Sequence, residues 1–245
     1  MTAGSSFTPS DVAEVAALRL RHQEILARIG AAAERAGRDP SLISLVAVSK
    51  TVPAERLMAA VAAGLTVFGE NRVQEGEGKR PLVAGATWHL IGPLQANKAR
   101  RAIAAYDVVQ SVDSVDLAGR LDRIVAEERG PHARLPVLLQ VNVDRDPGKA
   151  GFDSVELARR LPGLLDHRNL RVDGLMTVGR LVADPEAARP TFRRLRELAA
   201  RLRAADGRLG GELSMGMSAD FEVAVEEGAT IVRVGRALFG ERSAP

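Results

Sequence analysis

The chain of 245 residues contains no cysteine, and this absence excludes a large part of protein chemistry. Thiolate nucleophiles, disulfides, Cys-ligated zinc and Cys-ligated iron–sulfur clusters all need a residue type that the sequence lacks. The absence is also compatible with a reducing compartment. A chain of this length buries roughly 70% of its unfolded surface when it folds, so it needs no disulfide or structural metal to hold a core.

Aromatic residues and net charge are also low, with one Tyr, one Trp, six Phe and a formal net charge of +3. A dedicated nucleic-acid-binding protein needs a one-sided basic stripe and rings that stack on bases, so we expect no nucleic-acid partner. The basic run formed by Lys98, Arg100 and Arg101 is more typical of a solvated helix face.

Long apolar runs are missing as well. None reaches about 18 residues, the length that spans a bilayer, so we expect no membrane partner. Residues 1–10 are small and polar and lack the apolar stretch of a signal peptide. The sequence therefore predicts a soluble, cytoplasmic protein whose first ten residues are flexible.

Lysine is the scarcest charged residue, because only four of the 34 cationic residues are Lys. Arg cannot replace Lys as an amine nucleophile, since a guanidinium stays protonated at any working pH. The lysines are therefore the first candidates for covalent chemistry. They are Lys50, Lys79, Lys98 and Lys149.

The remaining residues alternate between two periodicities. After a predicted helix from Asp11 to about Gly37, short β-branched runs alternate with Ala-, Leu- and Arg-rich stretches of helical spacing. The predicted strands are 43–48, 66–68, 87–91, 107–110, 136–143, 170–176, 212–214 and 230–234. The predicted helices between them are 54–63, 97–105, 114–128, 154–165, 185–205 and 219–227.

Strands that alternate with helices predict right-handed βαβ units and a parallel sheet. Eight units within this length favour a single (β/α)8 TIM barrel with an extra N-terminal helix, as one domain over residues 1–245. No GxGxxG follows the first predicted strand, which disfavours an open dinucleotide-binding sheet.

Lys50 lies where such a barrel carries its active site, at the C-terminal end of a strand. The first predicted strand ends at Val48, and Pro53 begins the next helix. A Lys that is partly desolvated at this rim has a lowered pKa, which frees its amine to form a Schiff base. The alternative is a rim Lys that pairs with a neighbouring carboxylate.

The segments after the last two predicted strands indicate a phosphate site. Loops at these positions commonly bind phosphate in this fold, and Gly235 would let the backbone approach an anion closely. Backbone donors at Ser218 and from Gly235 to Arg236 are the expected contacts. The alternatives are a plain turn and, for Ser218, an N-cap of the following helix.

A Schiff-base Lys that faces a phosphate site describes pyridoxal 5′-phosphate (PLP) bound through its aldehyde and its phosphate. Arg233, the last charged residue of the eighth predicted strand, would then lie at the ring nitrogen. A cation at that position keeps the nitrogen unprotonated and weakens the ring as an electron sink.

Six motifs in order, between about residues 10 and 240, resemble the pyridoxal phosphate homeostasis proteins, which act in the vitamin B6 pool. They are VAVSK at 46–50, FGEN at 68–71, WHLIG with LQANK at 88–98, GLM at 174–176, SMGMS at 214–218, and VRVG with FG at 232–240. The resemblance implies a single barrel like the cofactor domain of alanine racemase. It also implies PLP on Lys50, surrounded by Asn71, Ser218, Arg233 and Gly235.

Two positions depart from the family pattern. Arg72 stands where the family has Tyr, and Arg236 stands where it has Thr or Ser. The backbone N–H of Arg236 survives the second change, so we keep Arg236 among the cofactor-binding residues, through its N–H or its guanidinium.

Three functions fit these residues: a PLP carrier without robust turnover, an amino-acid racemase-like enzyme, and a cofactor-free Schiff-base aldolase. A racemase needs a second base, usually a Tyr from an added domain. Tyr106 precedes the fourth predicted strand, at the wrong end of the barrel, and the chain leaves no room for that domain. We therefore expect a monomeric carrier without catalytic residues, which exchanges PLP with PLP-dependent apoenzymes.

Other polar residues support weaker predictions. The four His residues share no metal-ligand spacing, so we expect no metal site. His89 lies within a predicted strand and is interpreted as a hydrogen-bonded core or rim residue, with an acid–base group as the alternative. Lys149 follows the fifth predicted strand and either binds an anionic group at the rim or is a solvated loop Lys. Asp113 is interpreted as a helix cap.

Overall fold

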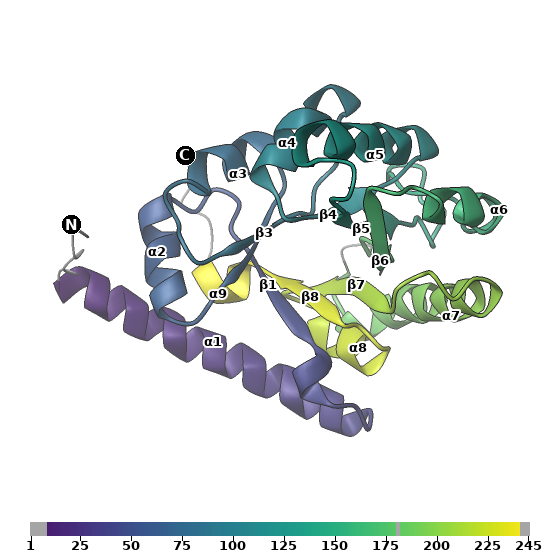
Figure 1. Cartoon of the computed structure of the whole chain (residues 1–245). Helices are drawn as coiled ribbons and strands as arrows, with labels where there is room; N and C mark the ends of the chain where they lie inside the picture. The colour runs from purple at the N-terminus through teal and green to yellow at the C-terminus, as the bar shows by residue number, and fades with distance from the viewer. Residues whose placement is uncertain (1–8, 180–181, 241–245) are drawn as a thin grey trace.

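The computed structural model describes residues 9–179 and 182–240. Its strands pair in sequence order, all parallel, and close into one barrel, which confirms the predicted TIM-barrel fold (Figure 1). The strands are β1 (Ser44–Val48), β2 (Val67–Glu70), β3 (Thr87–Leu90), β4 (Val108–Val112), β5 (Leu135–Gln140), β6 (Leu170–Met176), β7 (Glu212–Met217) and β8 (Ile231–Val234).

Helices surround the barrel, and the long α1 packs outside the ring against α2 and α8 (Figure 1). They are α1 (Pro9–Arg35), α2 (Ala54–Ala62), α3 (Val73–Lys79), α4 (Ala99–Ala105), α5 (Val115–Arg129), α6 (Ser154–Leu165), α7 (Arg189–Ala205), α8 (Phe221–Glu226) and α9 (Arg236–Phe239). Three 3-10 turns add η1 (Pro40–Leu42), η2 (Ala96–Lys98) and η3 (Pro185–Ala188).

Several boundaries differ from the sequence-based prediction. Helix α1 begins at Pro9, two residues before the predicted start, so residues 9 and 10 of the segment expected to be flexible belong to a helix. Residues 1–8 lie outside the described part. Helix α3 was not predicted, because its sequence VQEGEGK contains two Gly and no apolar repeat.

Strand β5 ends earlier than predicted, at Gln140. Val141 forms an isolated parallel bridge with Phe152, and the Asn142 side chain then turns the chain by donating to the carbonyl of Asp146. The predicted strand included this segment because its side chains alternate in polarity, whereas side-chain hydrogen bonds to the backbone decide its course.

Alternation along the strands separates two apolar layers. A small cluster inside the barrel contains Val46, Leu138, Met176 and Ile231. Residues of the opposite parity, such as Ala47 and Phe68, belong to the larger cluster between the strands and the helices. A residue's place in a strand therefore decides whether it faces the barrel axis or the helix layer.

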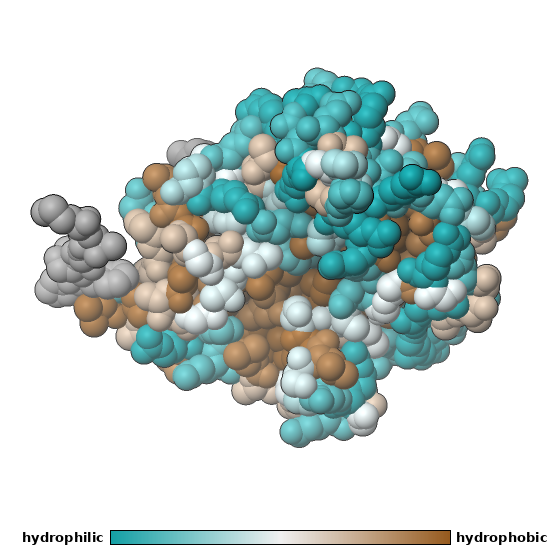
Figure 2. All heavy atoms as spheres, in the orientation of Figure 1, coloured by the Kyte–Doolittle hydropathy of each residue, from teal (hydrophilic) through white to brown (hydrophobic). Residues whose placement is uncertain are grey.

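The surface is mostly hydrophilic in the view of Figure 2, with a hydrophobic area near its centre, where β1 and β8 lie in Figure 1. Arg100 and Arg101 on α4 form ion pairs with Glu127 and Glu77, as expected for a solvated helix face. Among residues 9–179 and 182–240, no helix combines the length and apolar character needed to cross a bilayer.

Candidate functional site

One cavity of about 750 Å³ lies at the C-terminal ends of the strands, within the size range of small-molecule sites. It contains every residue that the sequence analysis assigned to cofactor binding: Lys50, Asn71, Ser218, Arg233, Gly235 and Arg236. These residues come from the ends of β1, β2, β7 and β8, so barrel closure brings them together.

Lys50 follows β1 in a tight turn at the rim of the cavity, as predicted. The amide of Val52 donates to the carbonyl oxygen of Ser49 at 3.0 Å, which closes the turn around Lys50. Thr51 adopts a left-handed conformation with φ of 66°, which is unfavourable for a β-branched residue. Such strain at a cavity wall is typical of a functional turn held by its surroundings.

Asn71 follows β2 and is held in place by the chain crossing above it. A Cβ atom on Gly92 would lie 2.2 Å from the backbone oxygen of Asn71 and 2.7 Å from its Cα, so only glycine allows this approach. Ile91, Gly92 and Pro93 form one wall of the cavity. Close packing against the Asn71 backbone thus explains why the WHLIG motif ends in glycine.

Arg233 lies in the barrel interior and is fully buried. Its guanidinium donates to the hydroxyl of Ser214 at 2.6 Å and to the carbonyl of Thr177 at 2.9 Å. Burial lowers the pKa of Arg233 to about 10, against the opposing charge of Asp220, so the side chain still carries its charge at pH 7. The structure thus holds a cation at the inner end of the cavity.

The hydrogen bonds of Arg233 continue across the barrel to His89. The Ser214 hydroxyl donates to Oε1 of Gln110 at 2.6 Å, and the Gln110 amide lies 2.7 Å from Nδ1 of His89. Burial lowers the pKa of His89 to about 4, so the ring is neutral at pH 7. His89 is thus hydrogen-bonded and half-buried, which agrees with its interpretation as a core or rim residue.

Ser218 and Gly235 already contact each other, because the Gly235 amide donates to the Ser218 hydroxyl at 3.1 Å. The N-cap alternative for Ser218 is wrong, since α8 begins after Asp220. A Cβ on Gly235 would meet the Cβ and carbonyl oxygen of Val48 at 3.2 Å. A side chain at 235 would therefore crowd β1, whatever anion the backbone approaches.

Arg236 is exposed and lines both the main cavity and a smaller adjoining pocket beside Thr51. With Lys50 and Arg233 it makes the cavity predominantly cationic, because Asp220 is the one carboxylate among the lining residues. A cationic cavity concentrates anionic ligands.

The sequence analysis missed Asp220 and the apolar walls. Asp220 is buried, and its Oδ1 accepts the amide of Met217 at 2.6 Å. Burial raises its pKa, while the Met217 amide and the charge of Arg233 act in the opposite direction. An Asp in the loop after a predicted seventh strand was a visible signal. The apolar lining residues gave none, because they are ordinary barrel residues.

The other lysines have separate surroundings. Lys79 is bound to buried Glu70, and Lys98 lies at the end of η2 outside the cavity lining. Lys149 is half-buried and donates to the carbonyl of Val178, a cavity-lining residue, at 3.1 Å.

Tyr106 does not line the cavity. Its ring is buried, and its hydroxyl donates to the carbonyl of Arg72 at 2.8 Å and accepts the amide of Gly76 at 3.1 Å. Burial raises the pKa of Tyr106. The Tyr106 side chain therefore binds the first turn of α3. Arg72, the residue that precedes this helix, is exposed.

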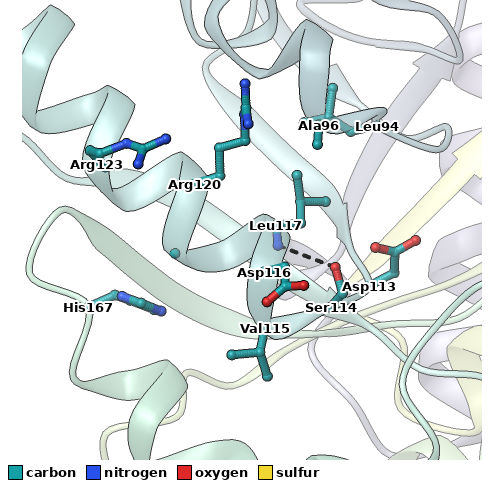
Figure 3. A pocket seen from close by; sticks show the side chains of 11 residues that line it. Leu94, Ala96, Asp113, Ser114, Val115, Asp116, Leu117, Arg120, Arg123 and His167 are labelled. Atoms are coloured by element: carbon teal, nitrogen blue, oxygen red, sulfur yellow. Dashed lines mark hydrogen bonds between the residues drawn. The ribbon is translucent and has the colours of Figure 1, made fainter.

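A second cavity, of about 590 Å³, lies beside the N-terminal half of α5 (Figure 3). Arg120 and Arg123 line it from the helix, and Asp113 and Asp116 from the preceding turn and the first turn of the helix. Ser114 is the N-cap of α5, so the assignment of the cap to Asp113 is wrong. This cavity contains no Lys, and no group of three metal-ligating side chains occurs in the described ranges.

Residues 12–243 match the family model of the alanine racemase N-terminal domain. A pyridoxal phosphate homeostasis protein of Pseudomonas aeruginosa is 44% identical over 224 residues, covering 89% of this chain and 93% of its own. A protein of the same name from Aquifex aeolicus is 41% identical, covering 91% and 97%.

Solved structures agree with these matches. PipY of Synechococcus elongatus, in a structure with PLP bound, is 40% identical with a TM-score of 0.77, over 88% of this chain and all of that one. Alanine racemase of Clostridium difficile is 16% identical with a TM-score of 0.69, over 93% of this chain and 56% of that one. The second likeness concerns the fold alone.

Proposed function

Because the chain belongs to the alanine racemase N-terminal domain family, and within it to the pyridoxal phosphate homeostasis proteins, we propose that it holds PLP for the intracellular vitamin B6 pool. One observation carries the proposal. All six residues expected to bind the cofactor line a single cavity, which offers an amine, a buried cation and a polar loop. These are the three groups that an aldehyde, a pyridine nitrogen and a phosphate ester require.

Lys50 would hold PLP through its amine, and the bound cofactor would supply an aldehyde able to form a Schiff base with amines by loss of water. The chain's own residues do the rest in this proposal. Ser218 and the backbone at Gly235 and Arg236 would hold the phosphate, Asn71 would contact the ring, and Arg233 would lie toward its nitrogen, because all of them line the same cavity. Because Arg233 stays charged at pH 7, it disfavours a second positive charge on that nitrogen.

We further infer that the protein carries PLP without robust turnover. An unprotonated ring nitrogen withdraws electrons weakly, so a bound substrate would gain little carbanion stabilisation. The racemase alternative also lacks its second base, since Tyr106 is buried against α3 and does not line the cavity.

Lys50→Arg tests the site directly. The variant keeps the positive charge at position 50 but cannot form the covalent bond. We therefore expect the variant mixed with PLP to lack the absorbance band, near the visible range, that the wild-type protein gives with PLP. Borohydride reduction followed by mass spectrometry of peptides should place PLP on Lys50. An adduct on Lys98 or Lys149 instead would show that the assignment is wrong, and a wild-type protein that gains no band would overturn the proposal.

The remaining predictions concern the protein in the cell. We propose a cytoplasmic monomer that exchanges PLP with PLP-dependent apoenzymes. Two experiments separate the routes of transfer. In one, a dialysis membrane keeps the PLP-loaded protein and an apoenzyme apart, so only free PLP can pass between them. In the other the two proteins are mixed, so PLP can also be transferred on contact.

A further inference from the structure

A buried acid–base pair lies directly behind the turn that carries Lys50. Glu70, the last residue of β2, is completely buried, and Lys79, the last residue of α3, is 13% exposed at its side chain. The Lys79 Nζ donates to Oε1 of Glu70 at 2.7 Å. Neither residue lines the cavity, so the proposed function does not use them.

The same lysine binds the backbone next to Lys50. Its Nζ donates to the carbonyl oxygen of Ser49 at 2.8 Å, and the Ser49 hydroxyl donates to Oε1 of Glu70 at 2.8 Å. The carbonyl that Lys79 contacts also closes the turn by accepting the Val52 amide. Lys79 thus binds the same carbonyl oxygen whose hydrogen bond closes the turn around Lys50.

Strand alternation places these contacts outside the barrel wall. Val48 and Lys50 both line the cavity, whereas Ser49 between them does not. Ser49 is fully buried and meets Glu70 and Lys79 on the side of helix α3. Glu70 and Lys79 therefore contact the turn on the side that faces α3, whereas Lys50 lines the cavity on the other side.

A buried ion pair is energetically unfavourable if packing is its only role. Burying two charges costs more than packing apolar side chains of similar volume, unless hydrogen bonds satisfy them. Here Oε2 of Glu70 is buried without a hydrogen-bond donor in the described residues. The unfavourable φ of Thr51 also needs surroundings that hold it.

We propose that the Glu70–Lys79 pair positions Lys50, by holding the Ser49 carbonyl so that the turn presents the amine to the cavity. This inference rests on the proposed function in that Lys50 is the attachment point. It assigns Glu70 and Lys79 as positioning residues that do not touch the cofactor.

Lys79→Met removes both donations and is the direct test. We expect the rate at which PLP becomes reducibly attached to Lys50 to fall by about tenfold, as small misplacements of a reacting group cost that much or more. Lys79→Arg should recover part of the rate, because it keeps a cationic donor. Arg101→Met, which breaks the exposed ion pair of Glu77 on the same helix, is the matched control and should leave the rate unchanged.

A second readout needs no cofactor. Competitive acetylation of the cofactor-free protein, with Lys98 as the internal reference, should show Lys50 of Lys79→Met labelled roughly threefold faster, because a released turn spends more time open to water. A role in stability alone would lower the unfolding temperature while leaving the Lys50 labelling ratio and attachment rate at wild-type values, and that result would overturn the inference.

The double variant Glu70→Met with Lys79→Met covers the case in which the single variant fails to fold. It leaves no lone buried charge, yet the Ser49 carbonyl still loses its donor, so slow attachment is again expected and a wild-type rate would refute the proposal. Failure of the proposed function is distinguishable, because the wild-type protein itself would then form no adduct on Lys50.

Discussion

Glu70 shows how burial changes the chemistry of a single side chain. Desolvation raises its pKa to about 7, although the contacts with Lys79 and Ser49 act in the opposite direction. Its neighbour Glu75 on α3 raises the pKa further. Because the folded-state pKa exceeds that of a solvated Glu, the stability gained by protonation is complete below about pH 4.5 and is lost as the pH rises through about 7.

Glu70→Gln removes this titration and gives a prediction. Between pH 5 and pH 8 we expect the free energy of unfolding of the wild type to fall by about 2 to 3 kcal/mol relative to the variant. Urea unfolding at both pH values measures it. His89 also titrates abnormally, but it does so in both proteins and cancels from the comparison. A difference that stays constant with pH would contradict the raised pKa of Glu70.

Ser218 is the better residue for testing the phosphate site. A larger residue at Gly235 would press on Val48 of β1, so its effect on binding could not be separated from packing. Ser218→Ala removes one hydroxyl and leaves the backbone in place. We expect it to weaken PLP retention by about tenfold, roughly 1.4 kcal/mol, which equilibrium dialysis measures. Unchanged retention would remove the Ser218 hydroxyl from the site.

At the scale of elements, β6 and β7 approach each other more closely than a side chain allows. A Cβ on Gly174 would lie 2.0 Å from the carbonyl oxygen of Glu212, and φ of Gly174 is 155°. The pairing of β6 with β7 therefore requires glycine at this position of the GLM motif.

Gly174→Ala tests this pairing. We expect a loss of at least about 2 kcal/mol in the free energy of unfolding, because the backbone has to shift to accept the methyl group. Gly163→Ala is the matched control. Gly163 lies exposed in α6, and a Cβ added there would have no atom within 4 Å, so Ala should stabilise the helix by about 0.5 to 1 kcal/mol. Equal effects of the two substitutions would argue against the close strand approach.

At the scale of the whole molecule, the barrel supplies a cationic cavity with one Lys among its described lining residues. Asp220 is its one lining carboxylate, and its Oδ1 is already bound to the Met217 amide. Racemisation needs a proton acceptor on each side of the cofactor. We therefore expect the PLP-loaded protein to turn over L- and D-amino acids more slowly than about 1 s⁻¹, below the ordinary enzyme range.

Chiral chromatography of a panel of amino acids, together with absorbance of released PLP, measures this expectation. Release of PLP without a change of chirality fits a carrier. Sustained racemisation at about 1 s⁻¹ or faster would promote the racemase-like alternative.

The sequence by itself determined the order and type of the elements. Hydrophobic periodicity is local, so the eight strands, most of the alternating helices and the position of Lys50 after β1 were predictable. The convergence of the predicted site residues on one cavity was predictable for a related reason. In a parallel barrel every strand's C-terminal end reaches the same rim, so residues such as Asn71 and Arg233 meet whatever the exact register.

Only the tertiary structure decided which polar groups pair with one another. The bond of Ser218 to the Gly235 amide, and the burial of Asp220 beside them, depend on how the β7 and β8 ends pack. The Glu70–Lys79 pair depends on α3, a helix whose sequence carries no apolar repeat. Such contacts join residues on different elements, and their energies depend on burial, which a local pattern does not encode.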